Sequence, residues 1–326
     1  MAELGLIIPG LTGVAGTALS PRVRAWLARA RALPALPGGL DAVLAGCAAP
    51  ALDARAVPAA APLKALGDGV AAADAGAGEL RELALVEPVS LAVHTDHVTV
   101  AGAPAPPLAP DDAAALADAL GTLWAEDGLE IEVAAPSRWY LCGPGVAAMA
   151  AGIAPVVECL GARFDQALLP SQAHIRLRRL LTEAQMLFHA HAVNARREAA
   201  GQPPIDGVWL SGGGRQVGSL TCEAQLFAAA PLAMGLMRLA GRAVQPAPQD
   251  FAALLEDWPA DTHTCWVLLP PADEAALERL EHDWLRPAWR ALARGRLAGL
   301  AWRDETGRGG RMGRRDRLRW WVRRWP

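Results

Sequence analysis

The sequence predicts an α/β protein with a mainly parallel sheet and a small ferredoxin-like α+β insertion. In the first and last parts of the chain, apolar β-type runs alternate with helical patterns, which favours parallel strands joined by helices. Between about 90 and 210 the order becomes strand, helix, strand, strand, helix, strand, as in ferredoxin-like domains. With 52% hydrophobic residues, the 326-residue chain can bury the core of such a fold.

The predicted core begins at the N-terminus. Leu4–Ile8 has the continuous apolar character of a buried strand, and the Pro9-Gly10 pair ends it. Arg22–Leu33 has helical spacing, and the Ala- and Pro-rich stretch Pro34–Gly78 predicts short helices and loops. The remaining core elements are three strands, at Val208–Leu210, Trp266–Leu269 and Leu297–Trp302, and two helices, at Ala228–Ala240 and Asp273–Arg294.

The insertion is predicted from its own set of elements. They are strands at Val89–Val93, Val98–Val100, Leu129–Val133 and Arg138–Cys142, and helices at Asp111–Trp124 and His174–Ala199. Gly201 and the following Pro203-Pro204 end the second helix, because glycine favours a helix end and proline cannot continue a helix. We therefore expect a core of residues 1–88 and 206–326, with the insertion at 89–205.

Charge and cysteine content exclude several classes of function. The net charge of −3 gives no general attraction to nucleic acid or anionic membranes. The five cysteines are scattered and form no C-x-x-C pair, so we expect neither a zinc site nor a disulfide framework. The apolar start carries Glu3 where a signal peptide needs positive charge, and Leu141–Val157 is short and interrupted for a membrane span. A cytoplasmic protein is the expectation.

The most informative stretch runs from Glu183 to Gly214. It reads Glu-Ala-Gln-Met-Leu-Phe-His-Ala-His-Ala-Val-Asn, continues through Arg197, Gly201 and Pro203-Pro204, and ends in Leu-Ser-Gly-Gly-Gly. This pattern resembles a region of the archaeal-type cofactor-independent phosphoglycerate mutases. It looks closer still to bacterial regulatory proteins of the RpfE type, a resemblance that spans most of the chain. Two positions depart from the mutase pattern, with Ala192 in place of proline and Asp206 in place of asparagine.

The resemblance implies an alkaline-phosphatase-like three-layer sandwich and a site with two divalent metal ions, such as manganese or zinc, beside a phosphorylatable serine. The sequence departs from that site. Pro9 stands where the family has a metal-binding aspartate, and residues 21–89 contain no serine or threonine, which leaves Cys47 as the one substitute nucleophile there. The late metal-ligand runs appear as Asp273–Leu277 and Asp304-Glu305, which keep acids but lack the histidines. We expect no catalytic residues, no metal ligands and no cofactor.

A retained anion-binding wall is the expectation for the motif itself. On one continuous helix, Glu183, Asn194 and Arg197 would lie within about 60° of one another. Guanidiniums bind carboxylates and phosphates, and glycines let an anion approach the backbone. The candidate ligand-binding residues are Arg138, Glu183, His191, Asn194, Arg197, Gly212, Gly213, Gly214 and Arg215. Structural roles are an open alternative, with Arg197 in a salt bridge or on the last helix carbonyls and the glycines in a tight strand exit. For His191, on the apolar stripe, a hydrogen-bonded core role is favoured.

Three functions are compatible with these observations. The first is a catalytically degenerate protein with a binding or regulatory role toward a phosphorylated metabolite or a protein partner. The second is an active metal-dependent phosphoglycerate mutase or phosphatase. The third concerns the tail Arg308–Pro326, whose eight arginines and interleaved tryptophans could bind nucleic acid or a membrane surface, although tryptophans packed on the core are favoured. The first function is the expected one.

Overall fold

The chain forms two compact units. The computed structural model describes residues 2–14, 19–36, 38–50, 59–70, 81–168, 174–215, 219–272 and 276–316. Unit 1 contains Met1–Val57 and Ser219–Pro326, and unit 2 contains Pro58–Gly218. The described helices include none that is both long enough and apolar enough to cross a membrane.

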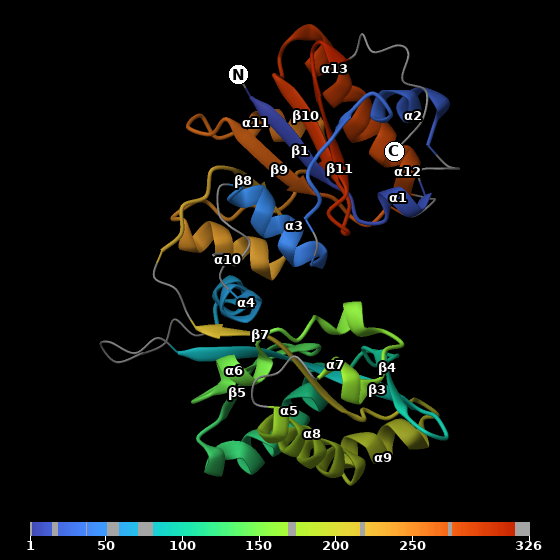
Figure 1. The fold of residues 1–326 in the computed structure, drawn as a ribbon, viewed down its shortest axis with the longest axis vertical. Helices are drawn as coiled ribbons and strands as arrows, with labels where there is room; N and C mark the ends of the chain where they lie inside the picture. Colours follow the sequence, from blue (N-terminus) through green and yellow to red (C-terminus); the bar gives the residue numbers. More distant parts are fainter. Residues whose placement is uncertain are drawn as a thin grey trace. The chain divides into compact units, whose positions relative to one another are not determined.

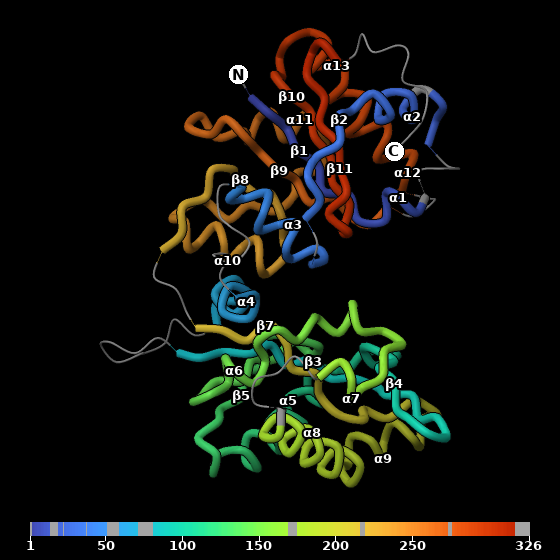
Figure 2. The backbone as a smooth tube through the Cα atoms, viewed as in Figure 1, coloured from blue at the N-terminus to red at the C-terminus, as the bar shows by residue number. Residues whose placement is uncertain are grey.

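Unit 1 is built on a six-stranded, mainly parallel sheet (Figures 1 and 2). Its central strand β1 (Glu3–Ile7) lies parallel between β9 (Thr264–Leu268) and β10 (Gly299–Arg303). On one side β8 (Gln225–Phe227) extends the sheet in parallel. On the other, β11 (Gly309–Gly313) and the short β2 (Arg31–Ala32) pair antiparallel and complete the order β2-β11-β10-β1-β9-β8.

Helices cover both faces of this sheet. Alternate side chains of a strand point to opposite faces, and Leu4, Leu6 and Trp302 all point into one apolar cluster. That cluster is completed by α2 (Pro21–Leu27), α11 (Phe251–Glu256), α12 (Ala276–Arg279), the π-helical segment η3 (Leu280–Leu285) and α13 (Arg286–Arg294). On the other face Cys47 of α3 (Gly39–Ala48) lies beside Arg303, and α3 packs on α10 (Pro231–Leu239). The layered, mainly parallel α/β architecture that the sequence predicts is confirmed.

Unit 2 contains a second, antiparallel sheet. Strands β3 (Glu82–Val93), β5 (Glu130–Ala135), β6 (Arg138–Cys142) and β7 (Gly207–Arg215) pair in the spatial order β7-β3-β6-β5, and β4 (Val98–Gly102) pairs with the end of β3. Helices α5 (Pro110–Trp124) and α8 (His174–His189) connect the strands and pack on the sheet with α9 (Ala192–Ala199). Numbered by position in the chain, the four strands have the order 4-1-3-2, so the ferredoxin-like prediction is confirmed.

Shorter elements complete the units. A small cluster on the opposite face of the antiparallel sheet is formed by α4 (Ala60–Asp68), whose Ala61 and Ala65 pack near Leu83 and Tyr140. The others are α1 (Leu11–Val14), η1 (Ala125–Asp127), α6 (Val146–Ala150), η2 (Val156–Cys159) and α7 (Phe164–Ala167).

The unit boundaries differ from the expected ones. A boundary after residue 88 would fall within β3, and β3 pairs with β7 from Glu82 to Val89 and with β6 from Leu83 to Val86. These hydrogen bonds hold the strand in one sheet, so unit 2 begins before it and includes α4. At the other end, the expected boundary before residue 206 would separate β7 from the sheet that it extends.

The helix predicted over His174–Ala199 is interrupted, and that prediction is wrong. α8 ends at His189, and α9 begins at Ala192. Between them His191 has an extended backbone, with φ −80° and ψ 142°, and its side chain caps α9 by accepting a hydrogen bond from the Val193 amide. Glu183 and Arg197 therefore do not lie on one continuous helix.

The start of the basic tail belongs to the sheet of unit 1. Gly309–Gly313 forms β11, which pairs with β10 along its length. This agrees with a packed role for the first part of the tail. Trp320, Trp321 and Trp325 lie outside the described residues, so the choice between a packed and a nucleic-acid-binding tail stays open for them.

Candidate functional site

The carboxyl ends of β1 and β10 form the edge at which parallel α/β proteins usually bind ligands. After β1 the chain turns at Pro9, whose carbonyl accepts a hydrogen bond from the Ala272 amide at 2.7 Å. The Gly10 amide then donates to Glu305 Oε2 at 2.6 Å, and Thr12 Oγ1 donates to Asp304 Oδ2 at 2.7 Å. Hydrogen bonds thus join the segment that follows β1 to the segment that follows β10.

Asp304 is the most constrained acid at this edge, and it has no exposed surface. Its Oδ1 accepts hydrogen bonds from the Thr306 amide at 3.0 Å, the Thr306 hydroxyl at 2.8 Å and the Arg308 amide at 2.9 Å. With Thr12 on Oδ2, both carboxylate oxygens hold the turn after β10 in place. This pattern satisfies a buried charge internally.

The residues at this edge do not fit the two-metal site that the resemblance implies. Pro9 offers no side-chain ligand, and Asp304 uses Oδ1 for three hydrogen bonds within its own turn and Oδ2 for one from Thr12. Among the residues that the structure describes, no three His, Cys, Asp or Glu side chains gather closely enough to hold a metal ion. Asp273 and Glu274 lie outside the described residues, so their placement at this edge stays a prediction.

Cys47, the one candidate nucleophile in the serine-free stretch, is buried in α3. Burial raises the pKa of the Cys47 thiol to about 12, and the neighbouring Arg303 guanidinium offsets only part of this effect. Because the thiolate is the nucleophilic form, a thiol with this pKa is unreactive near neutral pH. The geometry favours a packing role for Cys47.

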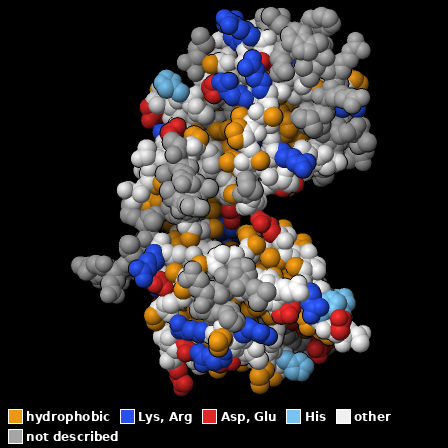
Figure 3. Space-filling view, in the orientation of Figure 1, with side chains coloured by type: hydrophobic (Ala, Val, Ile, Leu, Met, Phe, Trp, Pro, Cys, Tyr) orange, Lys and Arg blue, Asp and Glu red, His pale blue; other side chains and the backbone are white. Residues whose placement is uncertain are grey.

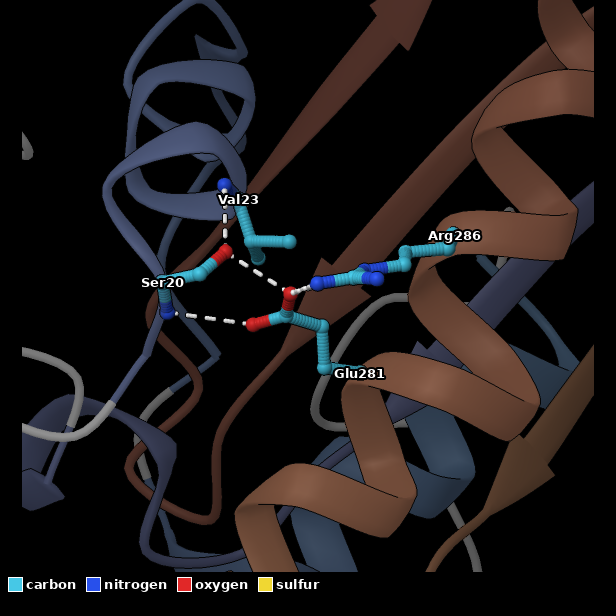
Figure 4. Close-up of polar contacts among 4 residues, drawn as sticks. All are labelled: Ser20, Val23, Glu281 and Arg286. Atoms are coloured by element: carbon cyan, nitrogen blue, oxygen red, sulfur yellow. Dashed lines mark hydrogen bonds and ion pairs between the residues drawn. The ribbon is translucent and has the colours of Figure 1, made fainter.

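A polar network joins α2 to the π-helical segment (Figure 4). Glu281 accepts hydrogen bonds from the Ser20 amide at 3.0 Å and hydroxyl at 2.7 Å, and from Arg286 Nη2 at 2.5 Å. Ser20 is also the N-cap of α2. Burial acts to raise the pKa of Glu281, but the bonds from Ser20 and Arg286 outweigh it and lower that pKa below its ordinary value. The network ties two distant parts of the chain together.

In unit 2, Asn194 of the motif is a buried structural link. Its side-chain amide donates to the Phe188 carbonyl at 2.8 Å and the Ile205 carbonyl at 2.9 Å, and its oxygen accepts from the Ile205 amide at 2.8 Å. These bonds join the break between α8 and α9 to the start of β7. Its amide nitrogen and oxygen are both occupied by backbone groups.

Arg197, Glu183 and His191 also have partners within the protein. Arg197 is buried, and its guanidinium donates to the Pro203 carbonyl at 2.8 Å and the Pro106 carbonyl at 3.0 Å. Glu183 lies 3.5 Å from Arg179 on the previous turn of α8. His191 is the cap of α9, not the core histidine that the sequence favoured, because the helix breaks there.

The three glycines make room for helices, not for an open backbone surface. A Cβ on Gly213 would lie 2.7 Å from the Ala147 carbonyl oxygen of α6, and one on Gly214 would lie 2.2 Å from the Cβ of Ala59. Gly212 has a φ of +64°, which favours glycine. Helices therefore occupy the space in which the sequence placed an anion.

The remaining two candidates, Arg138 and Arg215, form ion pairs at different places. Arg138 binds Asp68 at 2.7 and 2.8 Å, and Tyr140 donates to the same carboxylate at 2.6 Å. Arg215 pairs with Glu82 at 2.8 Å. The strand register separates them, since Arg138 begins β6 whereas Glu82 and Arg215 lie beyond the far end of β6.

The structure therefore brings together two subsets of the candidates and not the whole set. Asn194 and Arg197 both form hydrogen bonds with the loop that precedes β7. The three glycines and Arg215 lie at the end of β7. Ligand binding by these residues stays a prediction. Sequence reasoning missed the partner Asp68, which lies 70 residues from Arg138 and has no local signal. It also missed Thr12, the donor to Asp304. The position of Thr12, a polar residue shortly after the end of the first predicted strand, is a signal that could have identified it.

The sequence matches no family model and no curated protein, whereas several solved structures are similar to it. Among solved structures, the chain is similar to a cofactor-independent phosphoglycerate mutase from Thermoplasma acidophilum DSM 1728, with 17% identity and a TM-score of 0.45 over 95% of this chain and 88% of that one. It is also similar to the PH0037 protein from Pyrococcus horikoshii, with 15% identity and a TM-score of 0.53 over 95% and 86%. The TM-score of 0.45 carries no argument by itself, whereas the second comparison indicates a fold shared over nearly the whole chain.

Proposed function

We propose that this chain is a phosphoglycerate mutase-like protein that lacks mutase chemistry and acts by binding a phosphorylated metabolite. A regulatory role, through that ligand or a protein partner, is part of the proposal and follows the sequence resemblance to RpfE-type proteins. The observation that carries the proposal is the state of Asp304, whose two oxygens accept four hydrogen bonds from Thr12, Thr306 and Arg308.

Phosphoryl transfer by two metal ions requires an activated hydroxyl and acids that are free to bind the ions. By the resemblance, Pro9 stands where the family has a metal-binding acid, and residues 21–89 contain no side-chain hydroxyl. Cys47 is a poor substitute because burial raises the pKa of its thiol to about 12. These features support loss of catalysis with retention of the fold. An active metal-dependent phosphoglycerate mutase, or a phosphatase with relocated metal ligands, is the alternative.

The test combines metal analysis with two assays on the full chain. We expect no stoichiometric manganese or zinc after purification and no turnover of 3-phosphoglycerate or p-nitrophenyl phosphate with either metal added. We expect 3-phosphoglycerate to raise the melting temperature, since a ligand at 100 times its dissociation constant stabilises the folded state by about 2.7 kcal/mol. Stoichiometric metal together with turnover would establish the alternative.

A further inference from the structure

A groove in unit 1 between α11 and the C-terminal half of α13 combines an apolar wall with three arginines. Its volume of about 350 Å³ lies at the lower end of the range of small-molecule pockets. Phe251, Leu255 and Pro287 line the apolar part, and Arg290, Arg294 and Arg296 line the basic part. Figure 3 shows basic side chains at this end of unit 1 on the face that it draws, whereas the groove itself is defined by its lining residues.

The sequence places the three arginines together by simple helix geometry. Arg290 and Arg294 are four residues apart on α13 and so share one face. Gly295, with φ +78°, ends the helix, and its amide donates to the Leu292 carbonyl while the Arg296 amide donates to the Ala291 carbonyl. This turn brings Arg296 to the same groove. Because backbone amides already satisfy these helix-end carbonyls, the guanidiniums are not needed to cap them.

The three arginines of the groove form no ion pair with a described acid, although Asp250 and Asp283 also line the groove. All three arginines are exposed, and none of their guanidiniums forms a hydrogen bond or ion pair with another described residue. The two acids of the groove have other partners, because Asp250 caps α11 through the Ala253 amide and Asp283 lies 2.7 Å from His282. Like charges four residues apart on a helix also repel one another. An anion in the groove would relieve that repulsion.

We propose that this groove binds the phosphate group of an organic phosphate monoester, with the organic part against Phe251, Leu255 and Pro287. A monoester presents three terminal oxygens, one for each guanidinium, whereas a carboxylate presents two. The inference rests on the proposed function and deepens it, because it assigns phosphate binding to α13 and not to the carboxyl edge of the sheet.

Binding is measured by isothermal titration calorimetry on the full chain, at constant ionic strength, with phenyl phosphate, inorganic phosphate and benzoate as probes. We expect phenyl phosphate to bind more tightly than either other probe, because it uses both walls. Arg290→Gln and Arg294→Gln should each raise its dissociation constant about tenfold, the loss of one charged hydrogen bond. Leu255→Ser should reduce the preference for phenyl phosphate over inorganic phosphate.

Arg279→Gln is the matched control, because Arg279 is an exposed arginine of α12 outside the groove. It should leave binding unchanged, and the ligand-free melting temperature of all variants should change only by the small amount that is usual for surface substitutions. Equal loss of binding in Arg279→Gln would show a general charge effect and overturn the proposal. Binding that persists in both groove variants would also overturn it, yet would leave the proposed function intact. Turnover of 3-phosphoglycerate would contradict the proposed function and not the groove.

Discussion

The arginines of the motif in unit 2 and those of the groove in unit 1 differ in one respect that bears on function. Arg138, Arg197 and Arg215 each contact a carboxylate or carbonyl of the protein itself. Arg290 and Arg294 have no such contact among the described residues. A guanidinium that is already bound contributes to folding, whereas one without a partner can bind a ligand. The difference shows that a motif match alone does not identify a binding site.

The largest effect should come from the motif, in the variant Asn194→Ala. This change leaves the Ile205 amide and carbonyl without the side chain that binds them, whereas the Phe188 carbonyl keeps its bond from the His191 amide. Two buried groups that lose their partner should lower the free energy of unfolding by about 3 kcal/mol. Urea denaturation followed by tryptophan fluorescence measures the change, and hydrogen exchange locates it in unit 2. A stable Asn194→Ala variant with weaker binding of 3-phosphoglycerate would instead assign Asn194 to a ligand site.

Arg138→Gln should have the next largest effect. It leaves Asp68 with Tyr140 as its remaining hydrogen-bond donor among the described side chains, and it removes a bidentate ion pair. The pair is partly exposed, so we expect a loss of about 2 kcal/mol, less than for a fully buried pair. The double-mutant cycle with Asp68→Asn measures the coupling. Additive effects of the two substitutions would show that the ion pair does not stabilise the protein.

The sequence was most informative where the signal is local. Arg138–Cys142 was predicted as a strand with the observed bounds, and the order of elements in unit 2 was sufficient for its topology. β11 was harder to predict, since Gly-Gly-Arg-Met-Gly has little strand character and pairs because β10 offers an edge. The break at His191 depends on contacts of Asn194 with a later loop. Site prediction failed for the same reason, because partners such as Asp68 are close only in the folded chain.

Glu281→Gln tests an intermediate case on the same part of unit 1 as the groove. Arg286, unlike Arg290, donates hydrogen bonds to an acid, Glu281. The substitution Glu281→Gln removes the negative charge that pairs with Arg286. We expect a loss of about 1.5 kcal/mol at pH 7. The pKa of Glu281 is lowered in the folded state, so its contribution is present above the ordinary value of 4.5 and is lost as pH falls through the folded pKa. The difference between wild type and variant should therefore shrink below about pH 4.5 in urea titrations, and a difference independent of pH would contradict this.

The smallest effect on stability should come from Arg290→Gln and Arg294→Gln. Neither guanidinium has a partner among the described residues, so each change should alter the free energy of unfolding by less than about 0.5 kcal/mol. A slight gain is the expected direction, because Arg286, Arg290 and Arg294 follow one another at four-residue spacing and repel. Thermal unfolding at low and high salt measures both the size and the sign, since salt screens the repulsion and should reduce the gain. A loss of stability comparable to that of Arg138→Gln would show that these arginines, too, serve the fold, and the contrast between the two regions would disappear.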